Sequence, residues 1–291
     1  MAFWKRVRLT LDMIKFEHSI FALPFALTGA FLAVREFHLP ASEVWHKLLW
    51  IVLAMVGARS AAMAFNRILD ANFDARNPRT SMRHIPAGIL SSRFAWGFVF
   101  VSAMVLFAAA AMLNPLCLAL APLALGIVFF YSFTKRFTSL SHLVLGFCLG
   151  IAPAAAWIAM AGSLDPRILW LTAAVTFWTA GFDIIYSCQD YEFDVSSGLF
   201  SIPSRVGISN GLWIARALHV AMVGCLLALA ASFHLGWLSL LGIAAIVALL
   251  VYEHSLVKAN DLSRVNAAFF TVNGYVSVLF FLFWAADIYA H

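Results

Sequence analysis

Charged residues are scarce in this chain of 291 residues: Asp, Glu, Lys and Arg make up 11% of it, whereas hydrophobic residues make up 63%. A typical soluble domain is about a quarter charged and about half apolar. The mean hydropathy of +0.90 points the same way. This composition excludes an ordinary soluble domain and predicts an all-α polytopic membrane protein.

Cysteine is also scarce, and its spacing excludes two kinds of site. The four cysteines, Cys117, Cys148, Cys188 and Cys225, lie apart in apolar segments without CxxC or metal-ligand spacing. We therefore expect small packing residues rather than a disulfide framework or a cysteine metal centre. No cleavable signal peptide is evident either, because no small-residue cleavage site follows the apolar run that begins at Ser19.

Nine apolar runs are present, each close to the roughly 20 residues that span the hydrocarbon core of a bilayer. They cover residues 19–36, 48–68, 94–113, 116–133, 140–161, 168–188, 212–232, 236–256 and 267–289. Only Asn114-Pro115 separates the third run from the fourth. We predict nine transmembrane helices that form a single domain over residues 1–291.

Positive charge is distributed unevenly between the predicted loops. Fifteen Lys and Arg residues lie on the side of the N-terminus and three on the other side. The positive-inside rule therefore predicts a cytosolic N-terminus in the inner (cytoplasmic) membrane. The loops on the N-terminal side are also the longer and more polar ones, so we expect the active site to face the cytosol. This asymmetry explains the basic pI without nucleic acid as a partner.

Two carboxylates and an amide leave the second apolar run on one side of a predicted helix. Asn66, Asp70 and Asp74 lie four residues apart, so a helix would stack them about one turn from each other. Arg59 lies seven residues before Asn66 and shares that face. Charge at the end of a membrane helix is costly unless it has a partner, so this group requires one.

A second stretch repeats this pattern 120 residues downstream. Asp190 and Asp194 have the same spacing as the first acidic pair, and Asp183 lies seven residues before Asp190 on the same face. In both stretches, the acidic pair is followed by an Ile-Pro pair and an arginine. The repetition predicts a parallel internal repeat with a site between its halves.

Oxygen ligands on two helices suit Mg²⁺, which proteins usually hold with one or two carboxylates and substrate phosphates. The surrounding arginines, the Tyr131–Arg136 segment and Lys15 could then bind phosphate oxygens. A simpler interpretation stays open, in which these charges only anchor helix ends and pair with one another. In that case Arg59 would form a structural salt bridge with Asp70 or Asp183.

These residues resemble a known family, the UbiA superfamily of intramembrane prenyltransferases. Residues 66–74, followed by Asn77-Pro78-Arg79-Thr80, resemble its first aspartate motif, and residues 183–194 resemble its second. Tyr131–Arg136 matches its Tyr-x-x-x-Lys-Arg segment. The resemblance covers nearly the whole chain. It implies an all-helical bundle with a central cavity that faces the cytosol and binds a polyprenyl diphosphate.

The resemblance also implies roles for individual residues. The Mg²⁺ ligands would be Asn66, Asp70, Asp74, Asp190 and Asp194. The diphosphate would bind Arg59, Arg67, Lys135, Arg136, Arg205, Tyr131 and Lys15. Departure of diphosphate would leave an allylic cation that an electron-rich aromatic ring attacks, and Asp190 or Asp183 would stabilise the cation or take the ring proton, with Arg59 beside them.

Two segments of the sequence resemble branches of the family that use different aromatic acceptors. The Asp-x-x-Tyr-x-x-Gln-Asp form of the second motif resembles the branch that acts on 4-hydroxybenzoate in ubiquinone biosynthesis. The segment from Asp12 to Pro24 instead resembles enzymes that prenylate 1,4-dihydroxy-6-naphthoate in the futalosine route to menaquinone. We therefore favour the naphthoate, with 4-hydroxybenzoate as the alternative. Glu17 and His18 could contribute to acceptor binding, although an interfacial helix start explains them more simply.

Two other classes of protein remain as alternatives. A cation-coupled transporter would use intramembrane acids, but transporters place them near the midplane at broken helices, whereas these acids cluster at one face. A phosphotransferase of the CDP-alcohol type would also need Mg²⁺, but its Asp-Gly and Ala-Arg signature is absent from both acidic stretches. The sequence does not indicate an oligomeric state.

The acidic motifs lead to a direct prediction. Asp70→Ala and Asp190→Ala should each abolish prenyl transfer without loss of expression, because each removes a proposed carboxylate from the metal site. EDTA should also stop turnover and added Mg²⁺ should restore it, as measured by product formation in membranes. Full activity in EDTA would contradict the metal-dependent mechanism.

Overall fold

The apolar runs of the sequence form long helices. The computed structural model describes residues 3–15 and 21–290. Glu17 and His18 lie outside the described residues. The chain is 81% helix, and its described part contains no strand. The all-α class is thus confirmed.

Eight segments of the described chain are long and apolar enough to cross a membrane. Their helices are α3 (Ala41–Leu69), α5 (Ser92–Leu113), α6 (Pro115–Thr134), α7 (Ser141–Ala161), α8 (Leu169–Ser187), α11 (Ile208–Ser232), α12 (Trp237–Leu256) and α13 (Asn273–Ala290). They correspond to the second to ninth predicted runs, and they indicate a multi-pass membrane protein. Asn114 separates α5 from α6 as expected, and its Oδ1 accepts a hydrogen bond from Cys117 N at 2.9 Å.

The predicted count of nine transmembrane helices is not confirmed. The first predicted run, 19–36, corresponds to α2 (Leu23–Phe37), which has 15 residues. This length is below the roughly 17 residues that a spanning helix needs. Residues 16–20, which precede α2, lie outside the described part of the chain.

Short helical elements complete the fold. They are α1 (Phe3–Met13), α4 (Ala71–Asp74), α9 (Tyr191–Ser197) and α10 (Ile202–Val206), the 3₁₀ turns η2 (Pro166–Ile168) and η3 (Cys188–Asp190), and the π-helical segment η4 (Ala267–Val272). The elements α4, η3 and α9 contain or adjoin the two acidic motifs, so each motif lies where a long helix gives way to a short one.

The chain divides into two compact units. The first contains the described residues up to 15 and Leu49–Ser132, and the second contains residues 21–48 and 133–290. The first aspartate motif belongs to the first unit and the second motif to the second. The single domain and the cavity between the motifs therefore stay predictions.

In the first unit, α3 packs closely on α5. A Cβ atom added at Gly57 of α3 would lie 2.8 Å from Ser102 O and from Leu106 N of α5, so only glycine permits this approach. Towards the first motif, a hydrophobic cluster includes Met13, Phe65 and Val99. Phe65 stacks on Phe129 at 4.2 Å between ring centroids. This packing holds the part of α3 from which the motif emerges.

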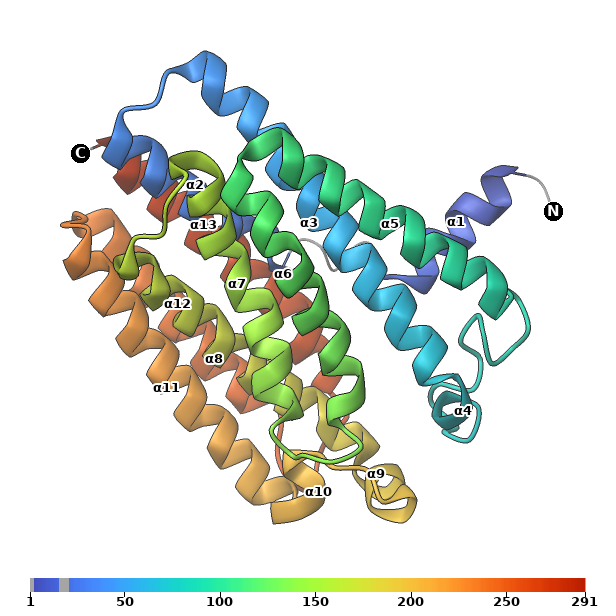
Figure 1. Ribbon diagram of the computed structural model, residues 1–291. Helices are drawn as coiled ribbons and strands as arrows, with labels where there is room; N and C mark the ends of the chain where they lie inside the picture. The colour runs from blue at the N-terminus through green and yellow to red at the C-terminus, as the bar shows by residue number, and fades with distance from the viewer. Residues whose placement is uncertain (1–2, 16–20, 291) are drawn as a thin grey trace. The chain divides into compact units, whose positions relative to one another are not determined.

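In the second unit, α8 is the central helix, and α7 and α11 both pack on it (Figure 1). Gly146 of α7 meets α8 so closely that an added Cβ would lie 2.2 Å from Thr176 O. The fully buried Trp178 of α8 packs on Phe25 of α2 at 5.0 Å between ring centroids. Close packing on several sides therefore holds the helix that leads into the second motif.

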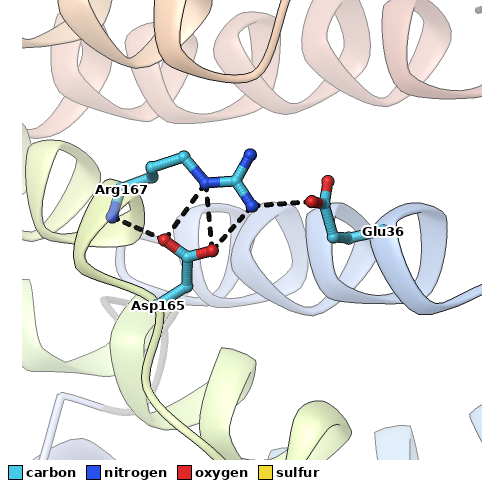
Figure 2. Close-up of polar contacts among 3 residues, drawn as sticks. All are labelled: Glu36, Asp165 and Arg167. Atoms are coloured by element: carbon cyan, nitrogen blue, oxygen red, sulfur yellow. Dashed lines mark hydrogen bonds and ion pairs between the residues drawn. The ribbon is translucent and has the colours of Figure 1, made fainter.

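An ion-pair network joins α2 to the turn before α8. Figure 2 shows the Arg167 guanidinium beside the Asp165 carboxylate, which accepts hydrogen bonds from Nε and from one terminal nitrogen of Arg167. The same terminal nitrogen donates to the Glu36 carboxylate at 2.6 Å. Arg167 also lies 4.5 Å from the centroid of the Phe233 ring. The network ties two segments that are far apart in the sequence.

This network predicts a pH-dependent stability. The hydrogen bonds from Arg167 lower the pKa of Asp165 below its usual value of 3.8. The carboxylate therefore contributes stability above that value, and the contribution is lost as the pH falls through the lowered pKa. Asp165→Asn should reduce the free energy of unfolding by roughly 0.5 kcal/mol at pH 7, since solvent reaches the half-buried pair and screens it. Thermal unfolding in detergent should show a lower stability of Asp165→Asn than of the unmodified protein at pH 7. The difference should disappear at a pH below the lowered pKa of Asp165.

Glu192→Gln, which neutralises an exposed carboxylate of the same unit, serves as the control and should leave the pH 7 stability unchanged. A difference between Asp165→Asn and the unmodified protein that stays constant with pH would contradict the prediction.

Candidate functional site

The first acidic motif surrounds a break between two helices. The long α3 ends at Leu69, and Asp70 occupies the N-cap position of the short α4 with φ −88° and ψ 1°. Hydrogen bonds still run from Asp70 N to Asn66 O at 2.9 Å and from Asp74 N to Asp70 O at 2.8 Å. The Asn66 Nδ2 group donates to Asp70 Oδ2 at 2.9 Å. The predicted four-residue spacing thus brings Asn66 and Asp70 into contact.

The second motif has the same local geometry. The long α8 gives way to η3, and Asp190 occupies the N-cap position of α9 with φ −97° and ψ 6°. Both Asp70 and Asp190 therefore lie in the sparsely populated bridge region, where active-site residues are often found. Neither side chain caps its short helix, although Asp is a favoured N-cap residue. This match supports the predicted internal repeat.

The last acid of the first motif is buried and only half satisfied. Asp74 is 6% exposed, and its Oδ1 accepts a 2.6 Å hydrogen bond from Arg83. Its Oδ2 is buried and has no hydrogen-bond donor among the described residues. Burial of an unsatisfied carboxylate oxygen is unfavourable, so the site requires a further positive partner.

The last acid of the second motif is likewise buried with one unsatisfied oxygen. Asp194 is 2% exposed, and Ser201 supplies a side-chain hydrogen bond to it. Its Oδ2 has no donor within the described chain. Lys135 and Asp190 are close enough for their charges to act on Asp194. The Phe200 N–H donates to Lys135 O at 2.8 Å, which holds the loop after α9 against the end of α6.

Within each motif, the carboxylates are oxygen donors of the kind that a hard divalent cation prefers. Each motif presents a buried carboxylate oxygen without a hydrogen-bond donor, and each places a second acid four residues earlier. Oxygen donors of this kind suit Mg²⁺. The ligand role of Asn66, Asp70, Asp74, Asp190 and Asp194 is therefore chemically consistent with the structure of each motif.

In the first unit, the predicted basic residues contact the segment that follows α1. Arg59 donates from a terminal nitrogen to Lys15 O at 3.4 Å, and Arg67 donates from Nε to Met13 O at 3.3 Å. The Lys15 ammonium pairs with Asp12 at 2.7 Å near the surface. Both arginines therefore help to hold residues 13–15 against α3.

In the second unit, the predicted basic residues lie around the loops that join the helices. Lys135 is half-buried, whereas Arg136 and Arg205 are exposed. The Arg205 guanidinium lies 3.9 Å from the centroid of the Phe200 ring, within the loop that adjoins Lys135. Lys135 is thus a predicted cation whose charge acts on Asp194. Tyr131 belongs to the end of α6 and to the first unit, where it is half-buried.

His142 is a site residue that the sequence analysis missed. Its imidazole is fully buried at the start of α7, with Nδ1 2.7 Å from Asp183 Oδ2. The Ile202 N–H donates to Nε2 at 3.2 Å, so Nε2 must carry a lone pair. The proton therefore lies on Nδ1 and is donated to the Asp183 carboxylate. Nothing in the spacing links these two residues, which are 41 positions apart.

Arg83 is the second residue whose role was missed. The sequence placed it near the first motif but did not assign it a partner, and the structure pairs it with Asp74. A loop of eight residues separates the two, so no helical periodicity relates them. Only the fold of that loop brings the guanidinium back to the carboxylate.

A comparison with protein families matches residues 22–285 of the chain to the UbiA prenyltransferase family. The chain belongs to the UbiA prenyltransferase family. It is accordingly an enzyme that transfers prenyl groups, which confirms the family resemblance inferred from the two motifs.

Relatives within the UbiA family cover most of the chain. A 4-hydroxybenzoate octaprenyltransferase of Vibrio atlanticus is 31% identical over 243 residues, which are 81% of this chain and 84% of the relative. One of Aliivibrio fischeri is 28% identical over 287 residues, 99% of this chain and 97% of the relative. These names do not support the naphthoate branch that the sequence analysis favoured.

Solved structures of UbiA homologues share the fold. The apo structure of a homologue from Aeropyrum pernix K1 is 34% identical with a TM-score of 0.83, and the match covers 93% of this chain and 98% of that one. A homologue from Archaeoglobus fulgidus, bound to GPP and Mg²⁺, is 20% identical with a TM-score of 0.76 over 97% of this chain and 99% of that one. At that identity the second match concerns the fold alone.

The His142–Asp183 contact predicts that His142 positions the carboxylate in this UbiA-family enzyme. His142→Phe should reduce the turnover number roughly 10- to 100-fold, since a hydrogen bond to a charged group contributes about 1.5–3 kcal/mol. His142→Gln retains a donor and an acceptor and should recover much of the loss. Prenyl-transfer rates and circular dichroism spectra of both variants would test this.

A merely structural role for His142 predicts another pattern. It would lower the helical content or the melting temperature of His142→Phe without a change in the turnover of the folded fraction. That result, or unchanged turnover in His142→Phe, would contradict the positioning role.

Proposed function

We propose that this protein transfers a polyprenyl group from a polyprenyl diphosphate to a carboxylated phenol of the 4-hydroxybenzoate type, in a Mg²⁺-dependent reaction. One observation carries the proposal. Both motifs break their helix in the same way, and four residues after each break lies a buried carboxylate with an unsatisfied oxygen. Two such carboxylates suit a metal-bound diphosphate better than a structural ion pair.

The proposed metal ligands are Asn66, Asp70 and Asp74 of the first motif with Asp190 and Asp194 of the second. The donor atoms support this assignment, because they are oxygens and two of them lack other partners. The Archaeoglobus fulgidus homologue was solved with DMAPP and Mg²⁺ and with GPP and Mg²⁺. When bound, Mg²⁺ would neutralise charge on the diphosphate and make it a better leaving group.

The proposed diphosphate-binding residues supply the remaining positive charge. They are Arg59, Arg67, Lys135, Arg136, Arg205, Tyr131 and Lys15. Lys135 has the strongest support, because its charge acts on Asp194. The arginines can bind diphosphate oxygens bidentately, which orients the leaving group as well as stabilising its charge.

The chemical step would break the C–O bond to diphosphate, and both bonding electrons would leave with the diphosphate. A ring carbon of the phenol then forms a C–C bond with the allylic cation, and the proton of that ring carbon passes to a carboxylate. Asp183 and Asp190 are the carboxylates proposed to stabilise the cation and to accept the proton. His142 orients the Asp183 side chain, because its Nδ1–H donates to one oxygen of that group.

The names of two relatives support 4-hydroxybenzoate as the acceptor. The Vibrio atlanticus and Aliivibrio fischeri proteins are named 4-hydroxybenzoate octaprenyltransferases, so this alternative replaces the naphthoate as the proposed acceptor. The Asp-x-x-Tyr-x-x-Gln-Asp form of residues 183–190 supports it. The excess of Lys and Arg on the N-terminal side supports a site at the cytosolic face of the cytoplasmic membrane.

A product assay tests the acceptor and the reaction together. The purified protein in lipid vesicles is given farnesyl diphosphate and Mg²⁺ with either 4-hydroxybenzoate or 1,4-dihydroxy-6-naphthoate, and products are resolved by mass spectrometry. We expect farnesylated hydroxybenzoate and release of diphosphate. Glu192→Gln, which changes an exposed acid of the second motif that is not a proposed ligand, is the matched control for Asp194→Asn and should retain activity.

Each other outcome has a definite meaning. Prenylated naphthoate without prenylated hydroxybenzoate would overturn the proposed acceptor and leave the transferase class intact. Activity of Asp194→Asn equal to that of Glu192→Gln would overturn the proposed metal site. Prenylation of neither acid would contradict the proposed function.

A further inference from the structure

A second cluster of ionisable side chains is buried in the second unit and contains no residue of the acidic motifs. It contains His219 of α11 with Glu253 and His254 of α12, and one ligand atom of each residue lies within 4.8 Å of the others. His219 is 3% exposed, Glu253 is 0% exposed and His254 is half-buried. Ionisable residues inside membrane helices are costly and are therefore typical of functional sites.

The surroundings of His219 fix the direction of its lone pair. Its Nε2 lies 3.3 Å from Trp178 O, which can only accept, so Nε2 carries the proton. Its Nδ1 therefore has a free lone pair. This lone pair faces His254 Nε2 at 3.0 Å and Glu253 Oε2 at 3.6 Å. Three potential ligand atoms thus lie within 4.8 Å of one another.

Glu253 presents one satisfied and one unsatisfied oxygen to the cluster. Its Oε1 accepts a hydrogen bond from Asn273 Nδ2 at 2.7 Å. Its Oε2 is buried, and the described part of the chain offers it no hydrogen bond, since 3.6 Å to His219 is too long for one. A proton shared between the two histidines would leave this oxygen unsatisfied, whereas a cation would satisfy it.

The residues behind these ligands hold them in place. Trp178 Nε1 donates to Asn273 Oδ1 at 2.8 Å, and Asn273 also donates to Ala268 O at 3.1 Å. Asn273 directly follows the π-helical segment η4, a feature that often occurs at functional sites. Ligand histidines and carboxylates in metal sites typically have outer hydrogen bonds of this kind.

The helix packing also leaves room for the imidazole. Gly181 of α8 faces His219 so closely that a Cβ atom would lie 2.3 Å from Nε2. A side chain at this position would displace the ring from the Trp178 carbonyl. Glycine at position 181 is therefore part of what places the His219 lone pair.

We propose that His219, Glu253 and His254 bind one transition-metal ion of the Zn²⁺ class. Tetrahedral zinc with bonds of about 2.0–2.1 Å separates its ligand atoms by roughly 3.3 Å, and the observed spacings of 3.0 and 3.6 Å lie on either side of that value. Two imidazoles and one carboxylate favour zinc over Mg²⁺, which prefers oxygen. The ion joins α11 and α12, and through Trp178 it stabilises the contact with α8.

Metal content measured on the intact protein tests this site. The protein is purified in detergent, stripped with a chelator, reloaded with Zn²⁺ in excess Mg²⁺ and desalted, and its zinc is measured by mass spectrometry. The excess Mg²⁺ competes with Zn²⁺ for oxygen-only sites, such as the site proposed at the acidic motifs. We expect about one zinc per chain. His254→Gln and Glu253→Gln should each lose most of it, whereas His46→Gln, an exposed histidine on α3, should retain it.

Cobalt supplies a second readout that does not depend on the variants. Co²⁺ in a tetrahedral site with nitrogen ligands absorbs visible light intensely, whereas octahedral oxygen sites absorb weakly. The unmodified protein should show the intense bands and lose them when Zn²⁺ is added. Failure of the unmodified protein to retain zinc, or equal zinc in His254→Gln and His46→Gln, would overturn the proposal.

Discussion

Buried carboxylate oxygens without hydrogen-bond donors are the constraint on which the rest of this structure depends. Asp74 and Asp194 each place one such oxygen inside a protein that is mostly apolar. Membrane helices tolerate this only with a positive partner. Arg83, Ser201 and Lys135 satisfy part of the requirement. The unsatisfied part is what makes both motifs suited to a divalent cation and its anionic ligand.

Helix packing makes these sites possible. Glycines at positions 57 and 146 allow α3 and α8, the helices that end at the motifs, to approach their neighbours closely. Such contacts fix the long helices, so the break at Asp70 or Asp190 occurs at the end of a rigid element. The same close packing at Gly181 places His219 and the proposed zinc ligands. Rigid helices and local breaks therefore serve two different polar sites.

The helical fold was largely predictable, because the apolar runs report directly which segments can span a membrane. Asn114-Pro115 separated two helices as expected, since the residue before proline disfavours helical geometry. The breaks in the helices at the acidic motifs were not predictable. The acidic spacing suggested one continuous helix through Asp74, but α3 ends at Leu69, and the π-helical segment before Asn273 has no local signal. The count of nine spanning helices is not confirmed, because α2 has only 15 residues in the described part of the chain.

The sequence by itself determined the helical class, the family and the two acidic motifs, because each depends on composition or on spacing within a few turns. It also brought Asn66 to Asp70, since one helical turn relates them. Tertiary structure alone decided that His142 meets Asp183, that Arg83 returns to Asp74 and that His219 meets His254. These contacts join residues far apart in sequence or across a loop. Helix packing and loop closure bring such residues together, and neither is encoded in local periodicity.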